Sequence, residues 1–140
     1  MSDRELKRFA LLADLSEGEL EALDDLLEPV TLRAGQQLFR EGQEADGLLL
    51  LHAGRLHFES ERAGDLGEAE PGTAVGAFSL VVVGRRETTA VASADAEVLR
   101  LSRTAFHRFA EDSPRGACRV LEAALRELAG ALRKGLDRLG

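Results

Sequence analysis

Residues 34–58 read AGQQLFREGQEADGLLLLHAGRLHF, a series of short apolar runs separated by glycines. The continuous runs Leu48–Leu51 and Leu80–Val83 suit strands that are buried on both faces. The same rhythm extends over residues 30–101, where glycines stand at positions 35, 42, 47, 54, 64, 67, 72, 76 and 84. Many short strands at regular turn spacing predict a β-sandwich or a small barrel over this region.

A helix is predicted on the amino-terminal side of these strands. Ser16 and Glu19 have the spacing of a capping box, and Leu15 and Leu20 are placed as a hydrophobic staple. We therefore expect a helix to start at Ser16. Pro29 is the expected stop, because a proline ring cannot continue the helical hydrogen-bond ladder.

Helices are also predicted after the strands. Phe106 and Phe109 have helical spacing, and Ser113 followed by Pro114 is typical of an N-cap and a first helical residue. From there an apolar stripe recurs at helical spacing: Leu121, Leu125, Leu128, Leu132, Leu136 and Leu139. The stripe packs either on its own domain or on the same helix of a second subunit. We expect the second, a homodimer through Leu121, Leu125, Leu128, Leu132 and Leu136.

The composition limits the class of protein. With 140 residues, 44% apolar and 31% charged, we expect one domain over 1–140: a helical segment (1–29), a β-roll (30–101) and carboxyl-terminal helices (102–140). A net charge of −7 and the absence of Trp and Tyr argue against nucleic-acid binding. No apolar run at the amino terminus resembles a signal peptide or a membrane span, so a cytoplasmic protein is expected.

Metal or disulfide chemistry is not expected. Cys118 is the single cysteine, so an internal disulfide is impossible. The three histidines, His52, His57 and His107, are dispersed. His57 alternates with Leu56 and Phe58 and is therefore expected to face solvent. We predict no metal cofactor and no catalytic residue.

The order of these segments resembles the effector domain of the catabolite activator and FNR family and other cyclic-nucleotide-binding domains. Residues 12–20 (LADLSEGEL) resemble the family's opening helix, and residues 34–46 (AGQQLFREGQEAD) resemble its next hairpin. Residues 49–56 (LLLHAGRL) resemble the following strand and turn, and residues 71–76 (PGTAVG) the lead-in to its ligand site. The resemblance implies a mainly β fold with flanking helices. Its centre would be a jelly-roll-like β-roll (double-stranded β-helix), between an N-terminal helix and a long C-terminal helix.

The resemblance also places a ligand site. The family's phosphate-binding cassette runs approximately Gly-Glu-Leu-Ala-Leu, a spacer and Arg-Ser/Thr-Ala. Its helix N-terminus and arginine hold the cyclic phosphate, and its glutamate accepts from the ribose 2′-hydroxyl. Here residues 76–92 read GAFSLVVVGRRETTAVA, and Gly76 and Arg86 match without gaps. The implied ligand-binding residues are Val75, Gly76, Ala77, Phe78, Ser79, Arg86, Glu87 and Thr88.

The cassette departs from the family pattern at two positions. Ala77 replaces the ribose-binding glutamate, and Glu87 stands where a phosphate-binding Ser or Thr belongs. A shift by one residue would instead place Glu87 at the arginine position and Thr88 at the hydroxyl position. Positions whose hydroxyls reach the base in the family fall near Ala131 and Leu132. These differences predict weakened or changed nucleotide binding. The competing interpretation is that residues 85–87 form a solvated charged turn.

Three classes of function follow. The first is a non-catalytic regulatory or sensor domain that takes a cyclic nucleotide or another small anion. We expect no DNA-binding domain after the long helix and therefore expect the output to pass through a partner protein. The alternative is a dimeric interaction scaffold that has lost its ligand. A metal enzyme similar to the cupins ranks third, because the sequence shows no His-x-His pair.

Overall fold

The computed structural model describes residues 3–139, and the side chains of residues 5–135. The chain divides into two compact units, residues 1–25 with 107–140 and residues 26–106. The first unit holds helices α1 (Asp3–Leu6), η1 (Ala10–Leu12), α2 (Glu17–Asp24) and most of α3 (Arg103–Asp112), together with α4 (Pro114–Leu139). The second holds the ten strands found in the described residues.

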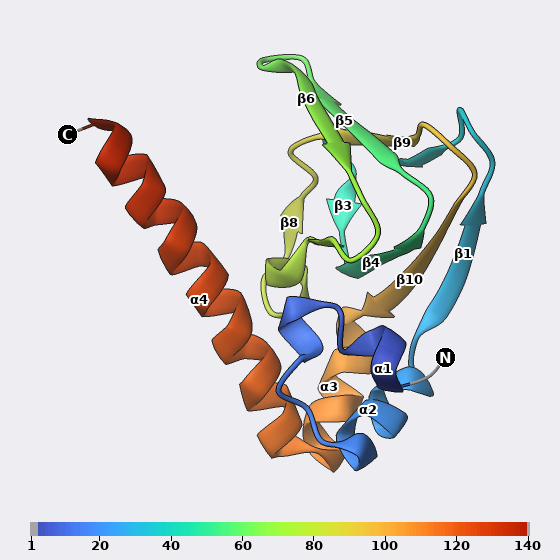
Figure 1. Ribbon diagram of the computed structural model, residues 1–140, viewed down its shortest axis with the longest axis vertical. Helices are drawn as coiled ribbons and strands as arrows, with labels where there is room; N and C mark the ends of the chain where they lie inside the picture. The colour runs from blue at the N-terminus through green and yellow to red at the C-terminus, as the bar shows by residue number, and fades with distance from the viewer. Residues whose placement is uncertain (1–2, 140) are drawn as a thin grey trace. The chain divides into compact units, whose positions relative to one another are not determined.

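The strand unit contains two four-stranded antiparallel sheets, with strand orders β1-β10-β4-β7 and β2-β9-β5-β6 (Figure 1). A short β3-β8 pair completes it. The strands are β1 (Glu28–Leu32), β2 (Gln37–Phe39), β3 (Glu44–Ala45), β4 (Gly47–Ala53), β5 (Leu56–Ser60), β6 (Gly64–Ala69), β7 (Ala74–Val75), β8 (Gly84–Arg85), β9 (Thr89–Ala92) and β10 (Ala96–Ser102). This architecture confirms the predicted jelly-roll-like β fold with an amino-terminal helix and a long carboxyl-terminal helix.

Side chains from both four-stranded sheets form one apolar core. It includes Leu49 and Leu51 of β4, Leu56 of β5 and Phe39 of β2. Leu48–Leu51 are all buried, as predicted for a strand covered on both faces. Gly47 is required at the start of β4, because a Cβ atom there would overlap the carbonyl oxygen of Leu101.

Two sequence predictions about strands and helix ends are wrong. Val81, Val82 and Val83 do not continue a buried strand, since they are 50%, 57% and 69% exposed and follow the 3₁₀ helix η2 (Ala77–Leu80). A short apolar run has no periodicity that separates a strand from a helix end. Pro29 does not stop helix α2, which ends at Asp24; it lies within β1. β1 is an edge strand, the place where a sheet tolerates proline.

The amino-terminal helix begins as the sequence predicts. Ser16 is the N-cap of α2: its hydroxyl accepts from the Glu19 N–H at 3.2 Å, and Glu19 Oε1 accepts from the Ser16 N–H at 2.9 Å. Glu19 Oε1 also accepts a hydrogen bond from Arg119 Nη1 of α4 at 3.1 Å. The hydrogen bond from the Ser16 backbone is the main cause that lowers the pKa of Glu19, and the charge of Arg119 lowers it further. A single carboxylate therefore caps one helix and binds another.

Helix α4 starts at Pro114 as predicted, and Ala117 N donates to the Ser113 carbonyl at 2.9 Å. Its buried face is built of small residues, among them Ala117, Val120 and Ala124. The predicted leucine stripe lies largely elsewhere: Leu121 is half-buried, while Leu125, Leu128 and Leu132 are exposed. Leu136 and Leu139 belong to the helix, but their side chains lie outside the described ones.

Glu19→Gln should lower the free energy of unfolding by about 1 kcal/mol at pH 7, because it removes the charge that binds Ser16 N–H and Arg119. A lowered folded-state pKa stabilises only above the unfolded pKa of the carboxyl. The difference between wild type and variant should therefore vanish as the pH falls through the folded pKa. Urea unfolding across this range measures it, with exposed Glu21→Gln as control. An equal loss at low pH would contradict the assignment.

Candidate ligand-binding site

Arg86 is the cationic centre of the strand unit. It follows β8, and its half-buried guanidinium donates from Nη2 to the Gly47 carbonyl at 3.2 Å. Its Cζ atom lies 4.7 Å from the centroid of the Phe39 ring, a cation–π contact. Burial lowers the pKa of Arg86, while nearby Asp46 raises it and Arg100 lowers it further. An arginine keeps its charge through such shifts, so the site holds a permanent cation.

Gly76 lies directly against this guanidinium. It has a left-handed backbone with φ of +80°, and a Cβ atom at this position would overlap Arg86 Nη1. Helix η2 begins at the next residue, Ala77. The two residues that match the family's cassette, ten positions apart in sequence, are thus neighbours in the structure.

The other predicted ligand-binding residues surround these two unequally. Val75, Ala77 and Thr88 are half-buried and Ser79 is buried, whereas Phe78 and Glu87 are exposed. The inward-facing side chain of the charged turn is Arg86, as in the ungapped alignment. A solvated turn therefore describes Arg85 and Glu87 but not Arg86.

A cavity of about 510 Å³ opens beside Arg86, and we call it the Arg86 cavity. Arg86 is the one predicted site residue that lines it. Apolar and charged side chains share its wall: Val30, Leu38, Phe39, Gln43, Glu44, Asp46, Leu49 and Arg100. No local sequence pattern predicts that residues of β1 and β10 line a cavity with Arg86, because the pairing of strands distant in sequence brings them there.

Arg103 fixes the segment that follows η2, and sequence reasoning missed it. Its guanidinium donates to the carbonyls of Ser79 at 3.0 Å and Ala45 at 2.7 Å, and to that of Val82 at 3.4 Å. Its backbone N–H donates to the Asp46 carbonyl at 2.7 Å. Because Arg103 is the first residue of α3, these hydrogen bonds link the start of this helix to the backbone of residues 45–46 and 79–82.

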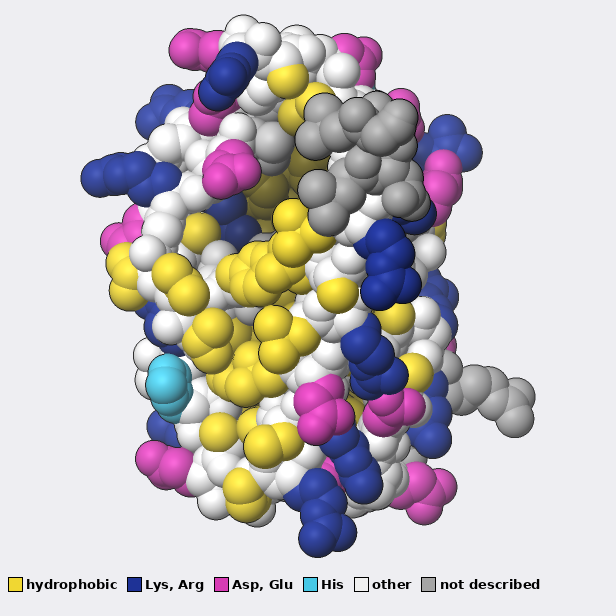
Figure 2. Space-filling view, turned by 90° about the vertical axis from the view of Figure 1, so that its left-hand side faces the viewer, with side chains coloured by type: hydrophobic (Ala, Val, Ile, Leu, Met, Phe, Trp, Pro, Cys, Tyr) yellow, Lys and Arg dark blue, Asp and Glu magenta, His cyan; other side chains and the backbone are white. Residues whose placement is uncertain are grey.

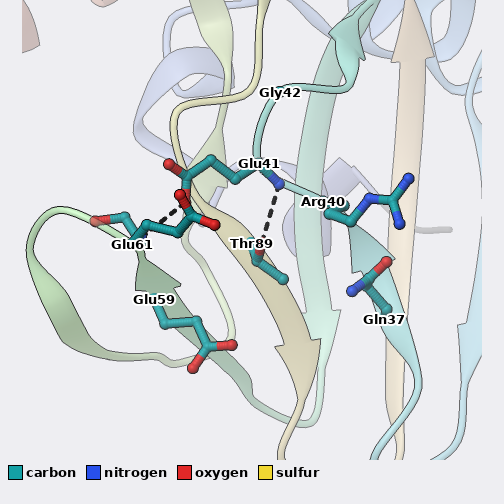
Figure 3. A pocket seen from close by; sticks show the side chains of 8 residues that line it. Gln37, Arg40, Glu41, Gly42, Glu59, Glu61 and Thr89 are labelled. Atoms are coloured by element: carbon teal, nitrogen blue, oxygen red, sulfur yellow. Dashed lines mark hydrogen bonds between the residues drawn. The ribbon is translucent and has the colours of Figure 1, made fainter.

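A second cavity, of about 610 Å³, is lined by three glutamates and one arginine, Arg40, and so carries an excess of negative charge (Figure 3). Glu41, Glu59 and Glu61 extend into its region, and Glu41 Oε1 accepts from the Glu61 N–H at 3.0 Å. Thr89 accepts from the Glu41 N–H at 2.9 Å. These carboxylates repel anions, so the larger cavity is the poorer match for a phosphate.

Among residues 5–135, whose side chains the structure describes, no group of three or more His, Cys, Asp or Glu side chains is arranged to hold a metal ion. Over residues 3–139, no helix combines the length and apolar character needed to cross a bilayer.

Comparison with known proteins identifies the family. The sequence model of the cyclic nucleotide-binding domain matches residues 29–113, and the chain belongs to this family. The N-terminal domain of a transcriptional regulator from Streptomyces coelicolor superposes with a TM-score of 0.82 at 27% identity, covering 97% of this chain and 95% of that one. A cyclic nucleotide-binding-like protein from Brucella abortus gives 0.68 at 34% identity, over 77% and 96%.

A curated relative places a similar sequence inside a much longer protein. Lysophospholipase NTE1 of Yarrowia lipolytica is 31% identical over an alignment of 115 residues that covers 66% of this chain. This chain spans 8% of that relative's length. Cyclic nucleotide-binding domains are regulatory rather than catalytic modules, which agrees with the non-catalytic prediction at the level of the family.

Gly76→Ala should lower the free energy of unfolding by about 1–2 kcal/mol, because alanine is strained at positive φ and its methyl group displaces Arg86. Gly84→Ala is the matched control, since a Cβ atom there meets nothing within 4 Å. Urea unfolding measures both variants. Equal effects of the two substitutions would show that Gly76 has no special role.

Proposed function

We propose that this chain is a non-catalytic regulatory domain that binds a small anionic ligand at Arg86, with weakened or changed specificity for cyclic nucleotides. One observation carries the proposal: the half-buried Arg86 guanidinium lies against Gly76 at the start of the cassette. Among the described residues, no carboxylate forms an ion pair with it. A partly buried cation that makes no direct ion pair favours an incoming anion.

The two altered cassette positions support the change in specificity. The methyl group of Ala77 cannot accept a hydrogen bond from a ribose hydroxyl. Glu87 adds a carboxylate next to Arg86 in sequence, although its exposed side chain is screened by solvent. Loss of one hydrogen bond to a charged group costs about 1.5–3 kcal/mol, which corresponds to roughly tenfold or more in affinity.

Calorimetric titration with cyclic AMP and cyclic GMP tests the proposal. Wild-type protein should bind weakly, with a Kd about tenfold or more above that of a variant that regains this hydrogen bond. Arg86→Ala should abolish binding, and Ala77→Glu should tighten it about tenfold by restoring the acceptor. Arg85→Ala is the control, because exposed Arg85 bonds the Gly42 carbonyl outside the Arg86 cavity.

Binding that survives Arg86→Ala would refute the anion site. Absence of binding at millimolar concentrations of both nucleotides and of inorganic phosphate would favour the scaffold function instead.

Exposed apolar side chains support this second function, an interaction scaffold. They are Phe78, Val81, Val82 and Val83 in the strand unit, and Leu125, Leu128 and Leu132 in α4. Hydrophobic side chains reach the surface over the face shown in Figure 2.

We also propose that two copies associate through α4. Leu125 and Leu132 are each 60% exposed and Leu128 is 37% exposed, at helical spacings of three and four residues. An apolar stripe of this kind is stabilised when the same stripe of a second helix covers it. Gly130 has nothing within 4 Å of an added Cβ atom, so the helix surface is open there.

Leu128→Glu with Leu132→Glu should convert the dimer to a monomer in sedimentation equilibrium, because burying two carboxylates in the helix pair is unfavourable. Leu66→Glu is the matched control, since Leu66 is exposed to a similar degree on β6. A mass unchanged by the double substitution would contradict the α4 dimer.

A further inference from the structure

Arg100 lines the Arg86 cavity and is held by two carboxylates. On β10 it lies directly opposite Glu28 of β1 in the sheet register. Its Nη1 lies 3.5 Å from Glu28 Oε2, and its Nη2 forms an ion pair with Asp46 Oδ2. The Arg100 side chain is one-third exposed, and its two carboxylate partners hold its guanidinium at the edge of the cavity.

Asp46 is placed where it acts on both arginines. It lines the cavity with Arg86 and directly precedes Gly47, whose carbonyl accepts from Arg86. The Asp46 charge is near enough to favour the charged form of Arg86, and this raises the pKa of the guanidinium. The ion pair that Asp46 makes, however, is with Arg100.

We propose that Arg100 is a positioning residue that holds the Asp46 carboxylate away from Arg86 and so keeps the Arg86 charge available to an anionic ligand. Without Arg100, the Asp46 carboxylate would be left next to a single half-buried cation and would pair with it. The pair would then exclude an incoming anion, since the ligand would have to displace a carboxylate. This role rests on the proposed binding of anions at Arg86.

The arrangement of charges also predicts which changes matter. The carboxylate of Glu28 contacts Nη1 of Arg100, whereas Asp46 pairs with Nη2. Glu28→Gln should therefore loosen Arg100 and weaken its hold on Asp46 without removing it. Arg100→Lys keeps a cation beside Asp46 and should behave nearly as wild type. Asp46→Asn removes the carboxylate that would compete for Arg86. In a chain that lacks Arg100, this second substitution should therefore restore the binding of an anion at Arg86.

The first test needs no ligand. Nitrogen-15 NMR of the arginine side chains should show the Arg86 Nε–Hε signal shifted in Arg100→Leu, with slower rotation of the guanidinium as it pairs with Asp46. Arg100→Leu/Asp46→Asn should return the signal to its wild-type position. Arg55→Leu is the matched control, because Arg55 makes a 3.3 Å ion pair with Glu70 outside the cavity. An Arg86 signal unchanged in Arg100→Leu would overturn the proposal.

The second test uses cyclic AMP and inorganic phosphate as probes. Arg100→Leu should weaken binding about tenfold or more, and Asp46→Asn in the same chain should restore it. Absence of binding by wild type would refute the proposed anion site, while the NMR result would still decide the role of Arg100. Weakened binding that Asp46→Asn does not restore would overturn the positioning role. Circular dichroism confirms that each variant is folded, and Arg100→Gln, which also lacks the charge, replaces Arg100→Leu if the latter is not.

Discussion

The half-buried guanidinium of Arg86 constrains the strand unit around it. A cation withdrawn from water needs acceptors, and here the Gly47 carbonyl and the Phe39 ring supply them. Its position also requires glycine at residue 76, because any side chain there would collide with the guanidinium. Through these contacts a single half-buried cation touches β2, the start of β4 and the residue before η2.

Arg103 and Arg100 extend this arrangement with backbone and carboxylate partners. Arg103 ties the carbonyls of Ala45, Ser79 and Val82 to the first turn of α3. Arg100 pairs with Asp46, the residue before Gly47. Three arginines therefore bind the segment of residues 45–47 through different atoms. A ligand that displaces this segment would also move Arg103 at the start of α3.

Local signals in the sequence predicted much of the fold. The Ser16–Glu19 capping box, the start of α4 at Pro114 and the buried strand Leu48–Leu51 depend on neighbouring residues and were predicted correctly. Pro29 and Val81–Val83 were not, because edge position and exposure depend on the whole sheet. Gly76 and Arg86 were found through the family resemblance. Arg100 and Arg103 were missed, since their side-chain hydrogen-bond partners lie 21 to 58 residues away in the sequence.

The most direct test of the anion site is an NMR titration of backbone amides and arginine side chains with cyclic AMP. Binding at Arg86 predicts that the largest shifts fall on Gly76, Ala77, Phe78 and the Arg86 side chain. The amides of Glu41 and Glu61, which border the acidic cavity, should move little. Shifts centred on the acidic cavity, or none on Arg86 at millimolar ligand, would contradict the account.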